Sequence, residues 1–269
     1  FETRVGLAIC KEGLGNFLAA EEHYKRAIEL RANYAEVHYN LGYLYQKQKL
    51  YESAAQQYEK AVNLKPKFIQ ALANWGLVWD RLHDPGKAVE IYQRALNVKQ
   101  DEAPIYVRLG SSLMKMSQYG EAKAAFENAL ALGEVRRSVF HDMGVIYEQE
   151  GAPEKALNFY RRALGLGKGS SETHFRVAGV LKELEKPVEA MNHFRQAISL
   201  DPDNANAHYG LAQLLLAEGS VVEATDLLNT FSKLKEYEGR LVPLRRAVEM
   251  APRDPQAAYD LAMLLSLIH

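Results

Sequence analysis

The side chains best suited to acid–base catalysis or metal binding include eight histidines, and three of these share one pattern. His38, His174 and His208 are separated by whole multiples of 34 residues. If each 34-residue stretch forms the same structural unit, these imidazoles lie one or more units apart, too far for one metal ion to bind them together. We therefore interpret them as packing residues and expect no metal site.

Three other features could support chemistry, and each has a simpler interpretation. His141 and Asp142 are neighbours, but the pattern places no serine or cysteine beside them, so a catalytic dyad is not expected. The glycine-rich segment 165–169 lacks the Gly-Lys-Ser/Thr ending of a phosphate-binding loop and is predicted to be a helix-end linker. Cys10, the one cysteine, excludes an internal disulfide and is interpreted as a packed small residue. The sequence thus predicts a protein that is not an enzyme and has no cofactor.

A pattern of small and aromatic residues recurs every 34 residues along most of the chain. We number each repeat from position 1, which is Ala35 in the second repeat. Position 20 is alanine in all seven copies, and position 8 is glycine or alanine in all seven. Fixed self-similarity at this period is typical of a stacked repeat array. Position 24 is aromatic in six copies and is occupied by Tyr24, Tyr58, Tyr92, Phe126, Tyr160, Phe194 and Leu228.

The spacing within one repeat predicts two helices that pack face to face. Residues recurring at three or four mark one face on each helix of the second repeat: His38, Leu41, Gly42 and Tyr45, then Ala54, Tyr58 and Ala61. The small residues let the helices approach closely, and the aromatic residue fills the remaining space. Because one such pair cannot bury its apolar face alone, neighbouring repeats must stack. Pro85, Pro153 and Pro187 share the predicted start of the second helix, where a fixed φ is tolerated.

This arrangement resembles the tetratricopeptide repeat (TPR) family. The second repeat matches the family's offsets at His38, Leu41, Gly42, Tyr45, Ala54, Tyr58, Ala61 and Pro66. The resemblance covers residues 1–234 and resumes around 247–269. It implies an all-α, right-handed superhelical solenoid of antiparallel helix pairs. It also implies a role in binding other proteins.

Repeat boundaries follow directly from the register. Seven tandem units are predicted over 1–234: 1–34, 35–68, 69–102, 103–136, 137–170, 171–204, and 205–234 as the start of the seventh. In 235–254 the register fails while apolar residues still recur at three or four, so we expect a helical insert with a kink or break near Gly239 and Pro243. Residues 255–269 repeat a first helix without its second, so the natural protein is expected to continue. The glycines of 165–169 predict a flex point between repeats five and six.

A recognition surface is predicted from positions 2, 5, 6, 9, 12 and 13 of the first helices, which point away from the packing stripe. In the TPR family these positions line a concave groove that holds partner peptides, and the resemblance implies the same here. Tyr, Arg and Asn are suited to recognition because they combine contact area with hydrogen bonding. The candidate groove residues are Tyr39, Asn40, Tyr43, Asn74, Arg108, His141, Asp142, Phe175, Arg176 and Tyr209.

Two specialised grooves of the family are matched only in part. A carboxylate clamp for an acidic peptide C-terminus needs five residues, of which Asn74 and Arg108 are present. An asparagine ladder, as in the O-linked N-acetylglucosamine transferases, would follow position 6, where only Asn40 and Asn74 are asparagines. The chemistry of the partner is therefore left open.

Composition narrows the classes of partner. The chain has 33 basic and 34 acidic residues and a formal net charge of −1, so no overall field attracts nucleic acid or an anionic membrane. It has no apolar run long enough to span a bilayer. We expect a protein or peptide partner, possible self-association through apolar residues 261–268, and a soluble protein of undecided compartment, cytoplasmic or periplasmic. Two functions stay open: a non-catalytic scaffold in a multiprotein complex, or the regulatory or targeting arm of a larger enzyme.

Overall fold

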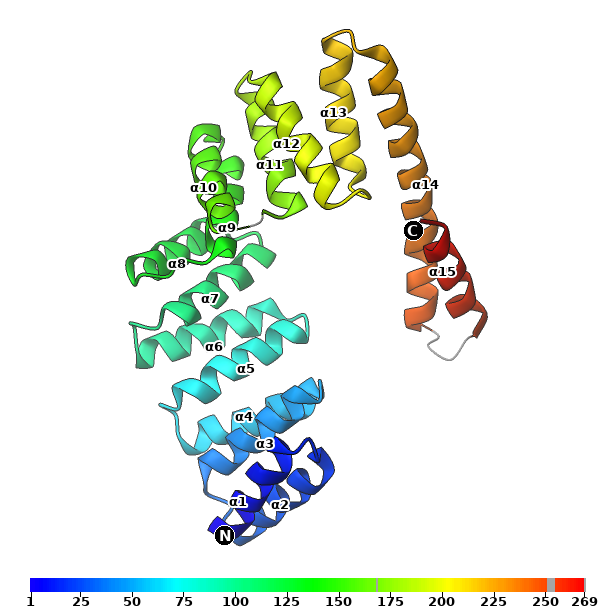
Figure 1. Cartoon of the computed structure of the whole chain (residues 1–269). Coiled ribbons are helices and arrows are strands. Elements are labelled where there is room, and N and C mark those ends of the chain that lie inside the picture. Colours follow the sequence, from blue (N-terminus) through cyan, green and yellow to red (C-terminus); the bar gives the residue numbers. More distant parts are fainter. Residues whose placement is uncertain (168, 251–254, 269) are drawn as a thin grey trace. The chain divides into compact units, whose positions relative to one another are not determined.

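The computed structural model describes residues 1–167, 169–250 and 255–268, and every helix or strand assigned within them is an α-helix (Figure 1). The predicted all-α class is confirmed. Odd-numbered helices are the first members of hairpins and even-numbered helices the second. The helices are α1 (Glu2–Gly13), α2 (Phe17–Leu30), α3 (Ala35–Lys47), α4 (Tyr51–Leu64), α5 (Ile69–Arg81), α6 (Pro85–Val98), α7 (Ala103–Lys115), α8 (Tyr119–Ala131), α9 (Arg137–Gln149), α10 (Pro153–Gly165), α11 (Ser171–Glu183), α12 (Pro187–Leu200), α13 (Ala205–Ala217), α14 (Val221–Met250) and α15 (Pro255–Ile268).

These helices form two compact units, Phe1–Val135 and Arg136–His269. In the first unit each hairpin stacks on the next, because α2 packs on α3, α4 on α5 and α6 on α7. The second unit is built the same way, with α10 on α11, α12 on α13 and α14 on α15. Each unit is therefore a stack of helix hairpins, as a helical TPR solenoid requires.

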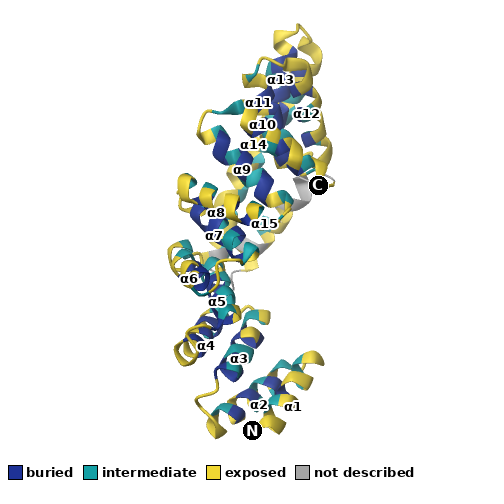
Figure 2. Cartoon of the chain, turned by 90° about the vertical axis from the view of Figure 1, so that its left-hand side faces the viewer, coloured by how far each residue is buried: buried dark blue, intermediate teal, exposed yellow. Residues whose placement is uncertain are grey.

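The core of each hairpin lies where positions 8, 20, 24 and 27 meet. The alanines at positions 20 and 27 and most of the rings at position 24 are fully buried. An ideal Cβ built on Gly42 would lie 3.0 Å from the ring of Tyr58, and one built on Gly144 would lie 2.4 Å from the ring of Tyr160. The predicted role of the small residues is thus confirmed. Figure 2 shows the buried residues following the packed faces of the helices, with exposed residues on the outer faces.

Local signals place the helix starts as predicted. Pro85, Pro153 and Pro187 are the first residues of α6, α10 and α12, where the missing N–H is not needed. Asp84 caps α6 by accepting a hydrogen bond from the backbone N–H of Lys87. The proline at the first helical position and the capping side chain before it both favour the start of the second helix at this point.

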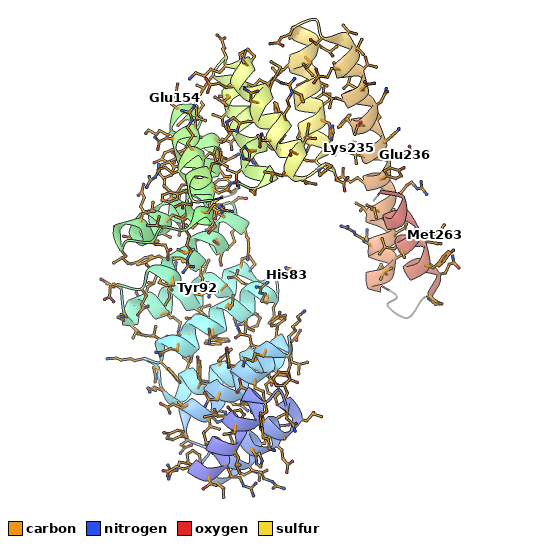
Figure 3. The ribbon with its side chains drawn as sticks, viewed as in Figure 1. His83, Tyr92, Glu154, Lys235, Glu236 and Met263 are labelled. Atoms are coloured by element: carbon orange, nitrogen blue, oxygen red, sulfur yellow. The ribbon has the colours of Figure 1, made fainter. Side chains whose placement is uncertain are left out.

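All seven hairpin turns within repeats have a left-handed residue at position 15, with φ between 57° and 86°. In the second repeat the N–H of Leu50 donates to the carbonyl of Tyr45, and the N–H of Lys49 donates to that of Gln46. This is the Schellman arrangement that closes a helix C-terminus. His83, labelled in Figure 3, occupies the turn between α5 and α6. The residues at position 15 are Gly15, Lys49, His83, Ser117, Gly151, Glu185 and Gly219.

The backbone conformation of the segment that connects one repeat to the next is different after repeats four and five. Position 31 is extended in four repeats, for example Lys65 with φ −137°. It is instead Gly133 and Gly167 after repeats four and five, with φ of +85° and +120°. The boundary between the compact units follows Gly133, one repeat earlier than the segment 165–169 that we expected to be a flex point. Flexibility between repeats five and six stays a prediction.

The second helix of the seventh repeat is longer than any other. Residues 235–250 of the predicted insert continue α14 and do not form a separate element. The helix runs uninterrupted through Gly239 and Pro243, so the expected break there is wrong, while a bend stays a prediction. The rest of the insert, 251–254, lies outside the described residues, as does His269 at the end of the predicted extra first helix.

The interpretation of Cys10 as a packed residue is wrong, because its side chain is exposed. Cys10 lies at position 10, where later repeats have buried residues such as Leu44 and Val78. Position 10 of the first repeat thus differs from the later repeats in being exposed.

Candidate protein-binding surface

The first helices of neighbouring repeats lie next to one another within each unit. In the first unit α3 contacts α5 and α5 contacts α7. In the second, His141 Nδ1 of α9 lies 3.0 Å from Thr173 Oγ1 of α11, and Lys182 Nζ of α11 donates to Gln213 Oε1 of α13. The candidate groove residues therefore form two sets on adjacent helices. We name them the first strip (Tyr39, Asn40, Tyr43, Asn74, Arg108) and the second strip (His141, Asp142, Phe175, Arg176, Tyr209).

The first strip contains a direct contact between two repeats. Asn74 Nδ2 donates to the hydroxyl of Tyr39 over 3.2 Å, and burial raises the pKa of that hydroxyl. The ring of Tyr39 also lies 5.0 Å from the ring of Phe68, measured between centroids. Tyr43, one turn further along α3, is 38% exposed, and Lys47 Nζ lies 4.9 Å from its ring centroid. Tyr39 is thus held by its neighbours, whereas Tyr43 is open to contact.

The remaining members of the first strip are half-buried polar groups. Asn40 lies on α3, and Arg108 lies on α7. Burial raises the pKa of the Tyr92 hydroxyl, and the nearby guanidinium of Arg108 opposes that rise. The side chain of Arg108 therefore lies near the buried ring of the third repeat while it stays partly exposed.

The second strip contains one tightly paired charge and one unpaired charge. Arg176 Nε donates to Glu172 over 2.8 Å, and Arg176 Nη1 lies 3.7 Å from a carboxylate oxygen of Glu148. Asp142 has no such partner among the described residues, and burial alone raises the pKa of its carboxyl to about 6. Burial also lowers the pKa of His141. The carboxylate of Asp142 therefore costs stability when it is ionised.

Position 5 turns out to be partly a packing position, which corrects the prediction that it points away from the core. The rings of Tyr39, His141 and Phe175 lie 5.5–6.0 Å from the ring at position 24 of the same repeat. Tyr209 packs on Phe231 instead, at 5.0 Å. Among the ten candidate residues, only Tyr43 and Tyr209 are classed as exposed and the other eight are half-buried.

Position 12 was also predicted to face outward, and here too the structure differs. The hydroxyl of the tyrosine at position 24 donates to the residue at position 12 of its own repeat: Tyr24 to Glu12 over 3.1 Å, Tyr58 to Gln46 over 2.7 Å, Tyr92 to Asp80 over 3.1 Å, and Tyr160 to Glu148. Where position 24 is phenylalanine, position 12 is Met114 or Lys182. A comparison of these two positions across repeats could have revealed the pairing from the sequence.

Two of the three histidines at position 4 contact a backbone carbonyl of the preceding repeat. His38 Nε2 lies 3.1 Å from the carbonyl of Ala32, and His208 Nε2 lies 2.9 Å from that of Pro202. His174 differs, because its Nδ1 lies 3.0 Å from Nδ1 of His193. Among the described residues, no group of three or more metal-ligating side chains is gathered in one place. No helix in the described part of the chain is both long and apolar enough to cross a membrane.

The stacked hairpins define a helical solenoid, and the chain belongs to the tetratricopeptide repeat family. Models of the family, described as TPR repeat or tetratricopeptide repeat, match residues 14–49, 35–68, 101–168 and 181–234. A comparison with curated proteins found no match.

Solved structures show the same fold at low sequence identity. A tetratricopeptide repeat protein from Parabacteroides merdae is 16% identical, with a TM-score of 0.64 and 98% of each chain covered. The Pseudomonas aeruginosa protein pilF is 19% identical, with a TM-score of 0.62, over 86% of this chain and 96% of that one. YrrB, described as a TPR protein with an unusual peptide-binding site, is 22% identical, with a TM-score of 0.59, over 68% of this chain and 94% of that one.

Proposed function

We propose that this chain is a non-catalytic scaffold that binds a partner protein or peptide along its first and second strips, as part of a multiprotein complex. The family and the fold support an interaction role. The described peptide-binding site of YrrB supports a peptide as the class of ligand. The strips are proposed as the binding surface because adjacent first helices bring aromatic, amide and guanidinium groups together there.

The observation that carries this proposal is the arrangement of Tyr39, Tyr43 and Asn74. Tyr43 is exposed, while Tyr39 beside it is fixed by its hydrogen bond to Asn74. A fixed aromatic surface loses little conformational entropy when a ligand binds, which favours affinity. A peptide along α3, α5 and α7 would meet aromatic area first and then the amide of Asn74 and the guanidinium of Arg108.

The second strip supports the proposal through its unpaired charge. Asp142 is a half-buried carboxylate, and no described side chain donates to it. Buried charges without partners are rare in structural roles and common at binding sites. A backbone N–H or a cationic side chain of the partner would satisfy it, so we propose that the segment bound along α9 and α11 supplies such a donor.

The test begins with a random peptide library displayed on phage and selected on the full chain. Selected peptides are synthesised, and their dissociation constants are measured by calorimetry with the wild type, Tyr43→Ala and Arg108→Ala. Each variant is expected to bind more than about tenfold more weakly, because interface energy concentrates in aromatic and arginine anchors. Both variants should retain the helix content and melting temperature of the wild type.

Tyr58→Ala is the matched control for a loss of packing. Tyr58 is fully buried, so this change should lower the free energy of unfolding by roughly 3 kcal/mol. If selected peptides bind Tyr43→Ala and Arg108→Ala as tightly as the wild type, the binding surface lies elsewhere and the assignment to the strips is wrong.

A further inference from the structure

The chain contains only two tryptophans, and both lie outside the strips. Trp75 and Trp79 are one turn apart on α5. Sequence periodicity places both in the core, and Trp75 is indeed buried, with 9% exposure. Trp79 is half-buried. The indole Nε1 atoms of both residues are shielded from solvent and have no hydrogen-bond acceptor among the residues that the structure describes, whereas a buried tryptophan usually has one.

A cleft of about 480 Å³ lies beside these indoles, between α4 and α5. Its volume falls within the range of small-ligand sites. Four of its lining residues come from α4, and the others come from α5 and the turn that follows it. The residues that line it are Glu52, Ala55, Gln56, Glu59, Trp75, Trp79, Leu82 and Asp84.

The charges around the indoles are divided between two neighbouring helices. On the α6 side, Lys87 Nζ lies 4.0 Å from the ring centroid of Trp79, and Arg94 Cζ lies 5.5 Å from that of Trp75. Neither cation lines the cleft, and no residue of α6 does. On the α4 side the charged residues are Glu52 and Glu59, and both are acidic. The open side of the tryptophan pair therefore faces carboxylates.

These carboxylates are available to a partner. Glu52 and Glu59 are exposed, and neither has a hydrogen bond or ion pair within the described part of the chain. The third acid of the cleft, Asp84, already has partners within the chain. Its side chain caps α6, and its Oδ2 lies 3.2 Å from Lys87 Nζ. The cleft thus offers two unpaired negative charges beside an apolar floor.

We propose that the cleft between α4 and α5 binds a basic side chain, lysine or arginine, of a partner peptide. The aliphatic part of that side chain would lie against Ala55, Leu82 and the indoles. Its cationic head would lie near Glu52 and Glu59 and the aromatic rings, which attract cations through their electron-rich faces. Charge complementarity selects a basic occupant over an acidic one. This site does not involve the strips and would stand if their assignment failed.

The two indoles give the test a direct readout, because a ¹H–¹⁵N spectrum of the labelled full chain contains two indole N–H signals, both from this site. The chain is titrated with acetyl-Gly-Arg-Gly-amide. The control is the same peptide with citrulline in place of arginine, which keeps the shape and removes the charge. Both indole signals are expected to shift and to saturate with the arginine peptide at concentrations up to about 10 mM.

Two variants separate this site from the rest of the surface. In the double variant Glu52→Gln/Glu59→Gln, affinity for the arginine peptide should fall about threefold to tenfold, as expected for the loss of two exposed ion pairs. Glu121→Gln, which removes an exposed acid on α8 outside the cleft and the strips, should leave the titration unchanged. The proposal is overturned if neither indole signal moves, if the citrulline peptide shifts both signals equally, or if the double variant binds the arginine peptide like the wild type.

Discussion

At the scale of single residues, the glycines at position 8 pack closely against the ring at position 24. In the fifth repeat a Cβ on Gly144 would lie 2.4 Å from Cε1 of Tyr160. We predict that Gly144→Ala lowers the free energy of unfolding by about 2 kcal/mol, because overpacking forces the buried ring to move. Urea denaturation followed by circular dichroism measures this change.

Gly179→Ala is the control for helix propensity. Gly179 lies inside α11, and a Cβ there would have no heavy atom within 4 Å. This variant should be unchanged or more stable by up to about 1 kcal/mol, since alanine favours helix more than glycine does. A Gly144→Ala protein as stable as Gly179→Ala would contradict the close contact.

Asp142 predicts a measurable dependence of stability on pH. Because its folded-state pKa, about 6, lies above the ordinary value of 3.8, the unfolded state loses its proton first as pH rises. Stability is thus highest below about pH 4 for this group and falls progressively until about pH 6. Asp142→Asn should remove this decline and raise the free energy of unfolding at pH 7 by about 1–2 kcal/mol.

The comparison is made by urea titrations of wild type and Asp142→Asn at pH 4, 5, 6 and 7. The difference in unfolding free energy between the two proteins should widen from pH 4 to pH 6 and then stay constant. A difference that does not change with pH would show that the carboxyl of Asp142 is not perturbed by burial.

At the scale of elements, the hairpin turns are the part of the repeat where sequence and conformation conflict. Glu185 at position 15 has φ 57°, a conformation that costs residues with a side chain but not glycine. Glu185→Gly should therefore raise the free energy of unfolding by about 0.5–1 kcal/mol. The reverse change at an equivalent turn, Gly219→Glu, should lower it by a similar amount. Thermal melts that moved both variants in the same direction would contradict this account.

At the scale of the whole molecule, the boundary between Val135 and Arg136 predicts that the first compact unit folds by itself. Stability in stacked repeats comes from neighbouring hairpins, and 1–135 keeps four complete ones. The fragment should show helical circular dichroism and a cooperative melt. A shorter fragment, 1–118, lacks α8, which packs on α7, and should aggregate or melt lower. A disordered 1–135 fragment would show that the unit depends on the rest of the chain.

Self-association through the C-terminal end also stays a prediction. Tyr259 on α15 is 60% exposed and Met263 is 49% exposed, so apolar area is accessible there. Sedimentation velocity over a range of concentrations should show reversible association of the chain. Tyr259→Lys should weaken it without changing the helix content. A wild type that stays monomeric at high concentration would contradict this prediction.

The sequence by itself determined the repeat period, the hairpin, the proline-marked helix starts, and the contact between Gly42 and Tyr58. These follow from local rules, because helical spacing decides which residues share a face and glycine or proline decides where helices begin and end. The TPR resemblance then supplied the expected surface. The expected break in the insert was wrong, because Gly239 and Pro243 do not end α14, whereas the kink expected there stays a prediction.

Only the tertiary structure decided how deeply each face is buried. By its spacing, Tyr39 lies outside the packing stripe. In the structure, however, its ring contacts the ring of Tyr58 across the hairpin, and its hydroxyl accepts a hydrogen bond from Asn74 of the next repeat. Cys10 matches buried positions in every later repeat but is itself exposed. Helical periodicity predicts on which side of its own helix a residue lies. Its burial depends in addition on the size of the side chains that pack against it from other helices. The acid-lined cleft beside the tryptophans arises in the same way, from the packing of α4 against α5.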